Sequence, residues 1–186
     1  MPERFFALIR FSLLLLLALA GCSKQETLPQ PTTTVAPAGP QSQASASPAK
    51  VTSTGVVKAS AMPVEMTAGG NAEATVQLKI TRGYHINANP PSESYLKATE
   101  VTVEAGAGIS AGKPAYPSSV MKKFSFAEKP LAVYEDEVQI KLPLRAAKTA
   151  TKGARQMPMW LRVQACDETA CYPPGTLDLN LQLTVK

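Results

Sequence analysis

The sequence predicts an all-β domain over residues 51–186, an antiparallel β-sandwich of the immunoglobulin-like type. Apolar and polar residues alternate there with a period of two in several short runs. Glycine, proline and asparagine separate the runs, and no stretch of this segment has a convincing helical period. Such alternation is typical of antiparallel strands with one buried face. Several such strands in one segment of this length favour a sandwich of two sheets.

Four runs show the alternation most clearly. Their apolar positions are Ala74, Val76, Leu78 and Ile80; Val138, Ile140, Leu142 and Leu144; Met159, Leu161, Val163 and Ala165; and Leu177, Leu179, Leu181, Leu183 and Val185. We expect each set to point into the core. Pro143 lies inside the second run. Because proline has no backbone N–H, we expect an edge position or a bulge there.

Residues 1–21 are predicted to be a lipoprotein signal peptide. An apolar run over residues 11–20 follows two arginines and is too short for a membrane-spanning helix, which needs about 20 apolar residues. Leu19-Ala20-Gly21-Cys22 then has the form of a bacterial lipoprotein processing site, with Cys22 as the lipidated residue. The protein is therefore expected to be lipid-anchored on the periplasmic side of a bacterial membrane, where disulfides persist. Ser23 is not the aspartate that retains lipoproteins at the inner membrane, which favours the outer membrane.

Residues 22–50 are predicted to be the lipidated cysteine and a disordered linker. The segment is rich in Pro, Ala, Ser, Thr and Gln and has no aromatic residue, so it cannot bury enough apolar surface to order itself. The chain has a formal net charge of +5, but its basic residues form no cluster. This distribution argues against nucleic-acid binding.

The most distinctive motif is Cys166-Asp167-Glu168-Thr169-Ala170-Cys171-Tyr172-Pro173-Pro174, between the last two predicted strands. Because Cys22 is expected to be lipidated, these two cysteines have only each other, or another protein, as partners. A structural disulfide closing so short a loop would contribute only about 2 kcal/mol. A short disulfide at a strand end is also readily exposed to exchange. The spacing alone leaves the structural and the redox interpretation open.

The charges in this loop bear on its chemistry. Asp167 and Glu168 lie between the cysteines, and the loop contains no lysine or arginine. Negative neighbours disfavour a thiolate and raise a cysteine pKa. The loop is therefore expected to be attacked by a partner's thiolate, or to reduce a strongly oxidising partner, and not to act as an autonomous oxidoreductase.

The cysteine motif, with Val163-Gln164-Ala165 before it, resembles the active-site loop of the N-terminal domain of the DsbD thiol:disulfide interchange family. Gly83-Tyr84-His85-Ile86-Asn87 resembles a strand of that family, Lys123-Phe124-Ser125-Phe126 its cap-loop region, and residues 131–138 the strand and turn after the cap. The resemblance spans roughly residues 56–186. It departs from the family in having four residues between the cysteines where the best-known members have five.

The resemblance implies an immunoglobulin-like domain whose cysteine pair, Cys166 and Cys171, carries electrons between redox proteins. It implies that Cys171 forms the mixed disulfide and Cys166 resolves it. A cap loop over residues 118–128 would shield the pair with Phe124 or Phe126. The residues expected around the pair are His85, Asn87, Asp167, Glu168 and Tyr172. For His85, a partly buried strand histidine without chemistry is favoured over a catalytic base.

The predicted function is a relay of electrons through the cysteine pair. The expected electron donor is a thioredoxin-like or membrane-embedded thiol–disulfide oxidoreductase. It is expected to be a separate protein, because residues 51–186 contain neither kind of domain. The expected electron acceptors are oxidised periplasmic thiol proteins. The alternative is a non-catalytic β-sandwich that binds a partner and has a structural disulfide. Whether the protein is an enzyme stays open. No cofactor or metal is predicted. Met157-Pro158-Met159-Trp160 invites a Cu(I) interpretation, but core packing explains Met159 well and no His, Cys or Met cluster with ligand spacing supports a metal site.

Overall fold

The computed structural model describes residues 50–186, and their regular structure consists of strands alone. The predicted signal peptide, the lipidation site at Cys22 and the predicted linker up to residue 49 lie outside the described residues. Within residues 50–186, no helix is long and apolar enough to cross a membrane.

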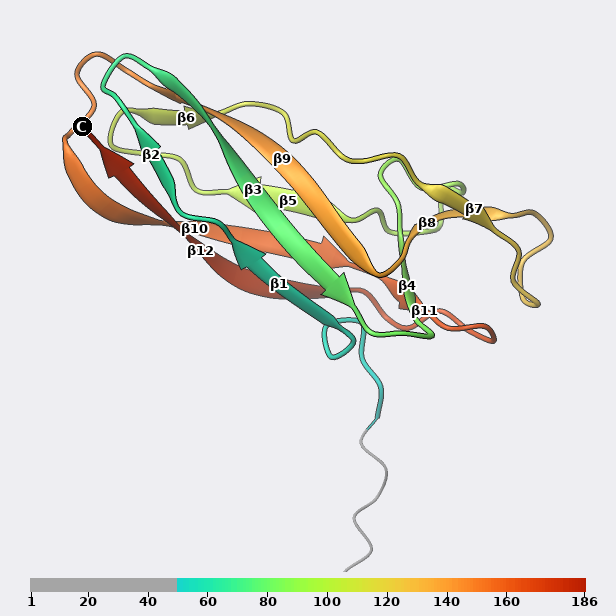
Figure 1. Cartoon of the computed structure of the whole chain (residues 1–186). Helices are drawn as coiled ribbons and strands as arrows, with labels where there is room; N and C mark the ends of the chain where they lie inside the picture. Colours follow the sequence, from blue (N-terminus) through green and yellow to red (C-terminus); the bar gives the residue numbers. More distant parts are fainter. Residues whose placement is uncertain (1–49) are drawn as a thin grey trace, which may run out of the picture. The chain divides into compact units, whose positions relative to one another are not determined.

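Two four-stranded sheets form the body of the sandwich (Figure 1). One has the strand order β1 (Val57–Ala61), β3 (Asn71–Ile80), β9 (Glu137–Ala146) and β6 (Ile109–Ala111). The other has the order β2 (Val64–Met66), β12 (Gly175–Val185), β10 (Gly153–Val163) and β5 (Glu100–Val103). All neighbouring strands are antiparallel except β2 and β12, which are parallel. The predicted all-β, immunoglobulin-like fold is confirmed.

A third sheet lies at one end of the sandwich, on the right of Figure 1. Its order is β11 (Ala165–Cys166), β4 (His85–Asn87), β8 (Leu131–Tyr134) and β7 (Val120–Lys122). The chain enters it from β3 through a turn in which Tyr84 N–H donates to the Thr81 carbonyl, and Gly83 has a φ of 85°. Glycine tolerates this left-handed conformation without steric cost. The turn leads directly into His85, the first residue of β4.

The predicted alternation places the core correctly. The buried side of the two large sheets includes Ala74, Val76, Leu78, Ile80, Val138, Ile140, Leu142, Leu144, Met159, Leu161, Val163, Leu181, Leu183 and Val185. Leu177 and Leu179 are only partly buried at the start of β12. Met159 is packed in this core, as predicted, and Met157 is packed there as well.

Pro143 lies in β9 where the pairing on one side is irregular. Ala111 pairs with Leu144, and the next bridge joins Ala115 to Lys141. Between these two bridges, the chain that follows β6 contains one residue more than β9. This extra residue is a β-bulge. Gly112 N–H donates to the Pro143 carbonyl across it. The expected bulge is therefore present, and the missing proline N–H faces the interrupted side.

The run predicted over Met159–Ala165 is not a single strand. β10 ends at Val163, and Ala165 begins β11 in the third sheet. Gln164, between them, is half-buried, and its side-chain oxygen accepts hydrogen bonds from Asn87 Nδ2 and Lys97 N–H. These bonds hold Gln164 where the chain crosses from one sheet to the other. The period of two continues through the crossing, which is why the sequence pattern shows no break.

Candidate functional site

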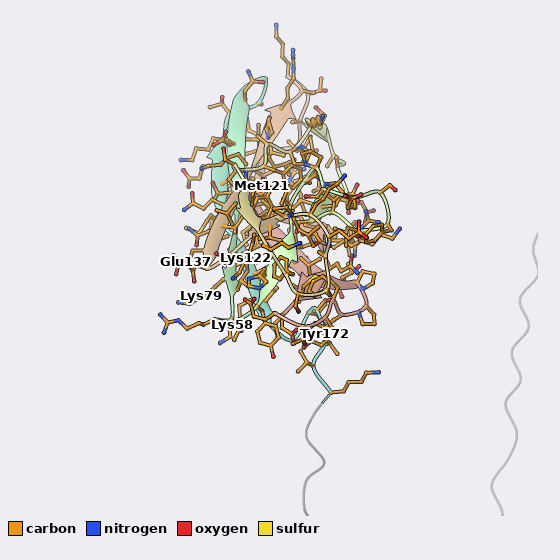
Figure 2. All side chains as sticks on the ribbon, turned by 90° about the vertical axis from the view of Figure 1, so that its right-hand side faces the viewer. Lys58, Lys79, Met121, Lys122, Glu137 and Tyr172 are labelled. Carbon is orange, nitrogen blue, oxygen red and sulfur yellow. A yellow bond between two sulfur atoms is a disulfide. The ribbon has the colours of Figure 1, made fainter. Side chains whose placement is uncertain are left out.

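Cys166 and Cys171 form a disulfide at the end of the third sheet. Cys166 is the last residue of β11 and pairs with His85 in β4. Beyond it the chain turns back as a narrow hairpin, with Asp167 N–H bonded to the Ala170 carbonyl and Tyr172 N–H bonded to the Ala165 carbonyl. Lys122 and Tyr172 are labelled in Figure 2, which views the molecule from the end where β7 and β11 lie.

The two sulfur-bearing residues differ in exposure. Cys166 is 1% exposed, whereas Cys171 is only partly buried. A reagent approaching from solvent therefore reaches Cys171 more readily than Cys166. This asymmetry suits attack at Cys171 and departure of Cys166.

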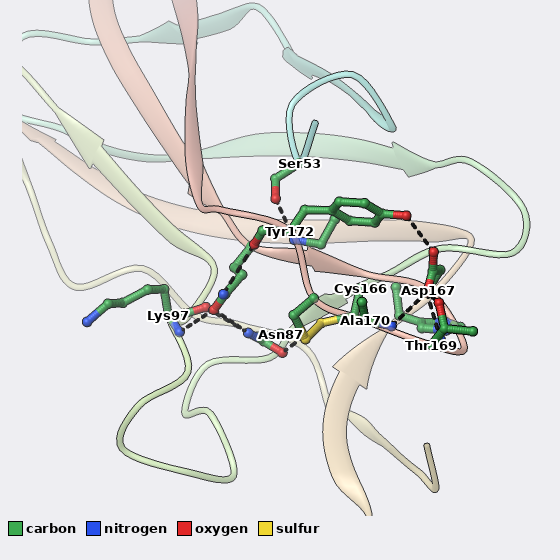
Figure 3. The surroundings of a disulfide bond; sticks show 12 residues. Ser53, Asn87, Lys97, Cys166, Asp167, Thr169, Ala170 and Tyr172 are labelled. Carbon is green, nitrogen blue, oxygen red and sulfur yellow. Dashed lines mark hydrogen bonds between the residues drawn. A yellow bond between two sulfur atoms is a disulfide. The ribbon is translucent and has the colours of Figure 1, made fainter. Parts of the chain in front are cut away.

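Asp167 shapes the hairpin loop (Figure 3). Its Oδ1 accepts hydrogen bonds from Thr169 N–H (2.7 Å), Thr169 Oγ1 (2.8 Å) and Ala170 N–H (2.9 Å). Tyr172 Oη donates to Oδ2. The Tyr172 hydrogen bond, together with those from Thr169 and Ala170, holds the pKa of Asp167 well below its usual range. The same bond raises the pKa of Tyr172 to about 12.

Phe124 belongs to a small apolar cluster separate from the main core. Its members are Leu96, Phe124, Ala127, Leu131 and Val133, and Cys171 packs against them. Phe124 is 1% exposed, whereas Phe126 is 40% exposed and stacks on Phe124 with ring centroids 5.2 Å apart. Of the two candidate cap residues, Phe124 is therefore the buried one, because its ring packs among residues from β8 and from the loop before β5.

The segment that contains these phenylalanines is also bonded to the cysteine loop. Ser125 Oγ donates to the Glu168 carbonyl at 2.9 Å. Lys122 Nζ lies 3.2 Å from Glu168 Oε1. The predicted cap segment and the cysteine loop are thus in direct polar contact.

His85 lies beneath this contact. Its ring centroid is 4.8 Å from that of Phe124, and its side chain is almost completely buried. Glu135 Oε1 is 3.0 Å from Nδ1 and Glu168 Oε1 is 3.5 Å from Nε2. Burial, and then the charge of Lys122, lower the pKa of His85, while the two glutamates act in the opposite direction.

Lys122 joins the two glutamates. Its Nζ donates to Glu135 Oε1 at 2.8 Å and also pairs with Glu168. The bond between Lys122 and Glu135 lowers the pKa of Glu135 and raises that of Lys122. The cysteine loop itself contains no lysine, but the fold brings Lys122 to it from β7.

Asn87 is fully buried on the other side of the disulfide. Its Nδ2 donates to Gln164 Oε1 (3.0 Å) and to the Lys97 carbonyl (3.3 Å), which leaves Oδ1 facing Cys166 Sγ at 4.0 Å (Figure 3). Gln164 was not among the predicted site residues. Neither was Ser53, whose Oγ accepts from Ala165 N–H and donates to the Pro173 carbonyl. Neither residue has a spacing signal that could have identified it.

The structure therefore brings most of the predicted site residues together. His85, Asn87, Asp167, Glu168 and Tyr172 all lie on the cysteine hairpin or beside it, and Phe124 packs with Cys171 in one cluster. Phe126 stacks on Phe124 and is the more exposed of the two rings. Among residues 50–186, no group of three or more metal-ligating His, Cys, Asp or Glu side chains is present.

Two solved structures are similar to parts of this chain. The N-terminal periplasmic domain of ScsB from Proteus mirabilis is 17% identical, with a TM-score of 0.47, and the match covers 67% of this chain and 44% of that one. The seventh ScaB type I cohesin from Pseudobacteroides cellulosolvens is 10% identical, with a TM-score of 0.42, over 70% of this chain and 92% of the other. At these values neither structure bears on function. This chain spans less than half the length of the ScsB chain.

The family comparison covers most of the described residues. No curated protein matches the chain. Residues 53–183 match the family described as "Thiol:disulfide interchange protein DsbD, N-terminal". The matched segment contains the disulfide, its neighbours and both predicted cap residues. The chain therefore belongs to the family of DsbD N-terminal domains.

Proposed function

We propose that this protein is an extracytoplasmic thiol–disulfide interchange domain that relays electrons through Cys166 and Cys171 to partner proteins. The observation that supports this most is the asymmetry of the disulfide: Cys166 is buried, while Cys171 is partly exposed and packs against the Phe124 cluster. A partly exposed Cys171 beside a separate apolar cluster suits exchange with a partner thiol, and a bond that only stabilises the fold does not require it.

The exchange proceeds in two displacements. A partner thiolate attacks Cys171 Sγ, the Cys166–Cys171 bond breaks, and its electron pair leaves on Cys166, which takes up a proton. The partner's second thiolate then attacks the partner sulfur of the mixed disulfide and releases Cys171. One partner dithiol is oxidised and this disulfide is reduced. The same steps in reverse pass the electrons to an oxidised acceptor.

The charges around the cysteine pair favour a disulfide that is attacked by a partner's thiolate over a thiol that attacks a partner. Asp167 and Glu168 lie between the cysteines, and the nearby Lys122 is already paired with Glu135 and Glu168. Among residues 50–186, the lysine that reaches the cysteine loop is therefore already neutralised and is not free to activate a thiolate on Cys171. The donor is a thioredoxin-like or membrane-embedded oxidoreductase that supplies the activated thiolate. The acceptors are periplasmic proteins with oxidised thiols.

The sequence-predicted anchor complements this role. Lipidation at Cys22 would retain the domain at the periplasmic face of a membrane, the outer membrane being favoured by Ser23. The linker predicted over residues 22–50 would give the domain reach toward soluble and membrane-bound partners.

The test is a reduction potential combined with trapping. Every variant includes Cys22→Ser, so that the pair contributes the only thiols. A reduction potential well above about −300 mV is expected, and a lower one would make the disulfide a structural bond in a binding module. Cys166→Ser leaves Cys171 free and should capture a partner as a mixed disulfide. Cys171→Ser is the matched control and should capture far less, because Cys166 is buried.

A further inference from the structure

His85 is a buried histidine whose two ring nitrogens lie near carboxylates but make no well-aligned hydrogen bond among the described residues. The side chain is 2% exposed, and neither Nδ1 nor Nε2 has a hydrogen-bond partner among the described residues. The carboxylates of Glu135 and Glu168 are close to the two nitrogens, at 3.0 and 3.5 Å, but not in hydrogen-bond geometry. Buried polar groups without partners are costly and uncommon. This one therefore calls for an explanation.

The imidazole lies between the redox loop and the predicted cap. Across the β4–β11 ladder its partner residue is Cys166. Directly paired residues in antiparallel strands have Cβ atoms about 5 Å apart on the same face of the sheet. On its other side the ring packs on Phe124. A displacement of Phe124 would therefore uncover the imidazole of His85.

Three charged groups face His85, one from each element packed around it. Glu168 comes from the cysteine loop, Glu135 follows β8, and Lys122 ends β7 two residues before Phe124. With a neutral imidazole these groups sum to one negative charge, and a proton on His85 would balance it. Burial and Lys122 oppose that proton while the segment is closed.

We propose that the closed cap keeps His85 neutral, and that cap opening on a partner lets it take up a proton, which places a positive charge beside Cys166 as the disulfide breaks. The inference rests on the proposed interchange function. Electron transfer to Cys166 creates a thiolate at a buried position, where an isolated charge is strongly disfavoured. An adjacent cation lowers the pKa of a thiol and stabilises that thiolate. A closed cap withholds the cation and so slows reduction by adventitious thiols.

The direction of the pH effect follows from the two states. The closed state has the lower His85 pKa, because burial disfavours the imidazolium, and the open state has the higher one. Between these two pKa values the open state binds more protons. A falling pH therefore favours opening in that interval and has no further effect below the closed-state pKa.

A proton NMR titration tests the coupling directly, since His85 is the single histidine of the chain. In the oxidised protein its midpoint should lie below 6.5, the ordinary value. Phe124→Ala should move it upward, and Trp160→Phe, at a partly exposed aromatic on β10, should leave it unchanged. Equal midpoints in the wild type and Phe124→Ala would overturn the proposal. If Phe124→Ala does not fold, Phe124→Leu provides the same comparison.

A kinetic profile tests the consequence for the sulfur. The disulfide is reduced with dithiothreitol in the wild type and in His85→Gln over about pH 5 to 8, the interval in which histidine changes charge. Taking the ratio of the two rates cancels the thiolate fraction of the reagent. The ratio of the wild-type rate to the His85→Gln rate should rise by about tenfold as the pH falls. A tenfold change corresponds to a difference of one pKa unit. A constant ratio would overturn the role of His85. If the ratio is constant but the reduction potential of the same sample lies above about −300 mV, the proposal for His85 fails while the interchange function is retained.

Discussion

Cys166 Sγ lies 4.0 Å from Asn87 Oδ1, and the amide cannot turn away because its Nδ2 is bonded to Gln164 and to the Lys97 carbonyl. A disulfide sulfur has no proton to donate, whereas a Cys166 thiol has one. The buried Oδ1 therefore gains a donor only when the disulfide is reduced. Asn87 is therefore expected to stabilise the reduced dithiol relative to the disulfide.

Replacing Asn87 should make the disulfide harder to reduce. We expect Asn87→Ala to remove a hydrogen bond of about 1 kcal/mol from the reduced state, equivalent to a reduction potential about 20 mV more negative. Equilibration with glutathione at several redox ratios measures this shift. Asn180→Ala, at an exposed position in β12, is the control and should leave the potential unchanged. An unchanged or less negative potential in Asn87→Ala would contradict the assignment.

The two phenylalanines of the predicted cap should behave differently. Phe124 is buried in the cluster that contacts Cys171, so Phe124→Ala should accelerate reduction by dithiothreitol and cost about 3 kcal/mol of unfolding free energy. Phe126 is 40% exposed and stacks on the outer side of this cluster against Phe124, so Phe126→Ala should have a much smaller effect on both. Rates with dithiothreitol and urea unfolding of the oxidised proteins provide the comparison. Equal acceleration by the two substitutions would show that the exposed ring shields the sulfurs as well.

The sequence predicted the long strands but not how the chain passes between sheets. β3, β9, β10 and β12 are ten or eleven residues long, so the period of two is repeated several times in each. β6 and β7 have three residues each, too few to show a period. The crossing at Gln164 keeps the alternation intact, and only the tertiary hydrogen bonds to Asn87 and Lys97 distinguish it.

The site was predictable where its residues lie close in sequence. The cysteine motif identified the hairpin, and the family resemblance added His85 and Asn87. The charge network was not predictable, because Lys122, Glu135 and Glu168 come from three separate segments. The burial of Phe124 was hidden by its polar sequence neighbours, Lys123 and Ser125, and depends on contacts with Leu96 and Leu131.

The hydroxyl of Ser125 should help to hold the cap segment on the cysteine loop. It donates to the backbone carbonyl of Glu168, so the bond does not depend on the glutamate side chain. We expect Ser125→Ala to shift the closed–open balance by about 1 kcal/mol, which corresponds to about a fivefold faster reduction by dithiothreitol. Ser119→Ala, at an exposed position before β7, is the control. Equal rates in Ser125→Ala and the wild type would exclude this bond as a restraint on the cap.

The bond between Tyr172 and Asp167 should be visible as an altered tyrosine titration. Tyr172 has a pKa of about 12 because its hydroxyl donates to the Asp167 carboxylate. In Asp167→Asn the anionic acceptor is lost, so the Tyr172 pKa should fall toward 10, the ordinary value. NMR of the tyrosine ring protons across the alkaline range measures this change. A Tyr172 pKa that stays near 12 in Asp167→Asn would exclude the carboxylate as its cause.

The same carboxylate should make the loop sensitive to acid. The pKa of Asp167 is lower in the folded protein than its ordinary value of 3.8, so its contribution to stability is fully present above that value. The contribution is lost as the pH falls through the folded pKa, because the protonated acid loses its charge in both states. The difference in unfolding free energy between wild type and Asp167→Asn should therefore be constant near neutral pH and shrink below about pH 4. Asp178→Asn, at an exposed position in β12, serves as the control. Urea unfolding at a series of acidic pH values measures the difference, and a difference that grows in acid would contradict the direction of the Asp167 pKa shift.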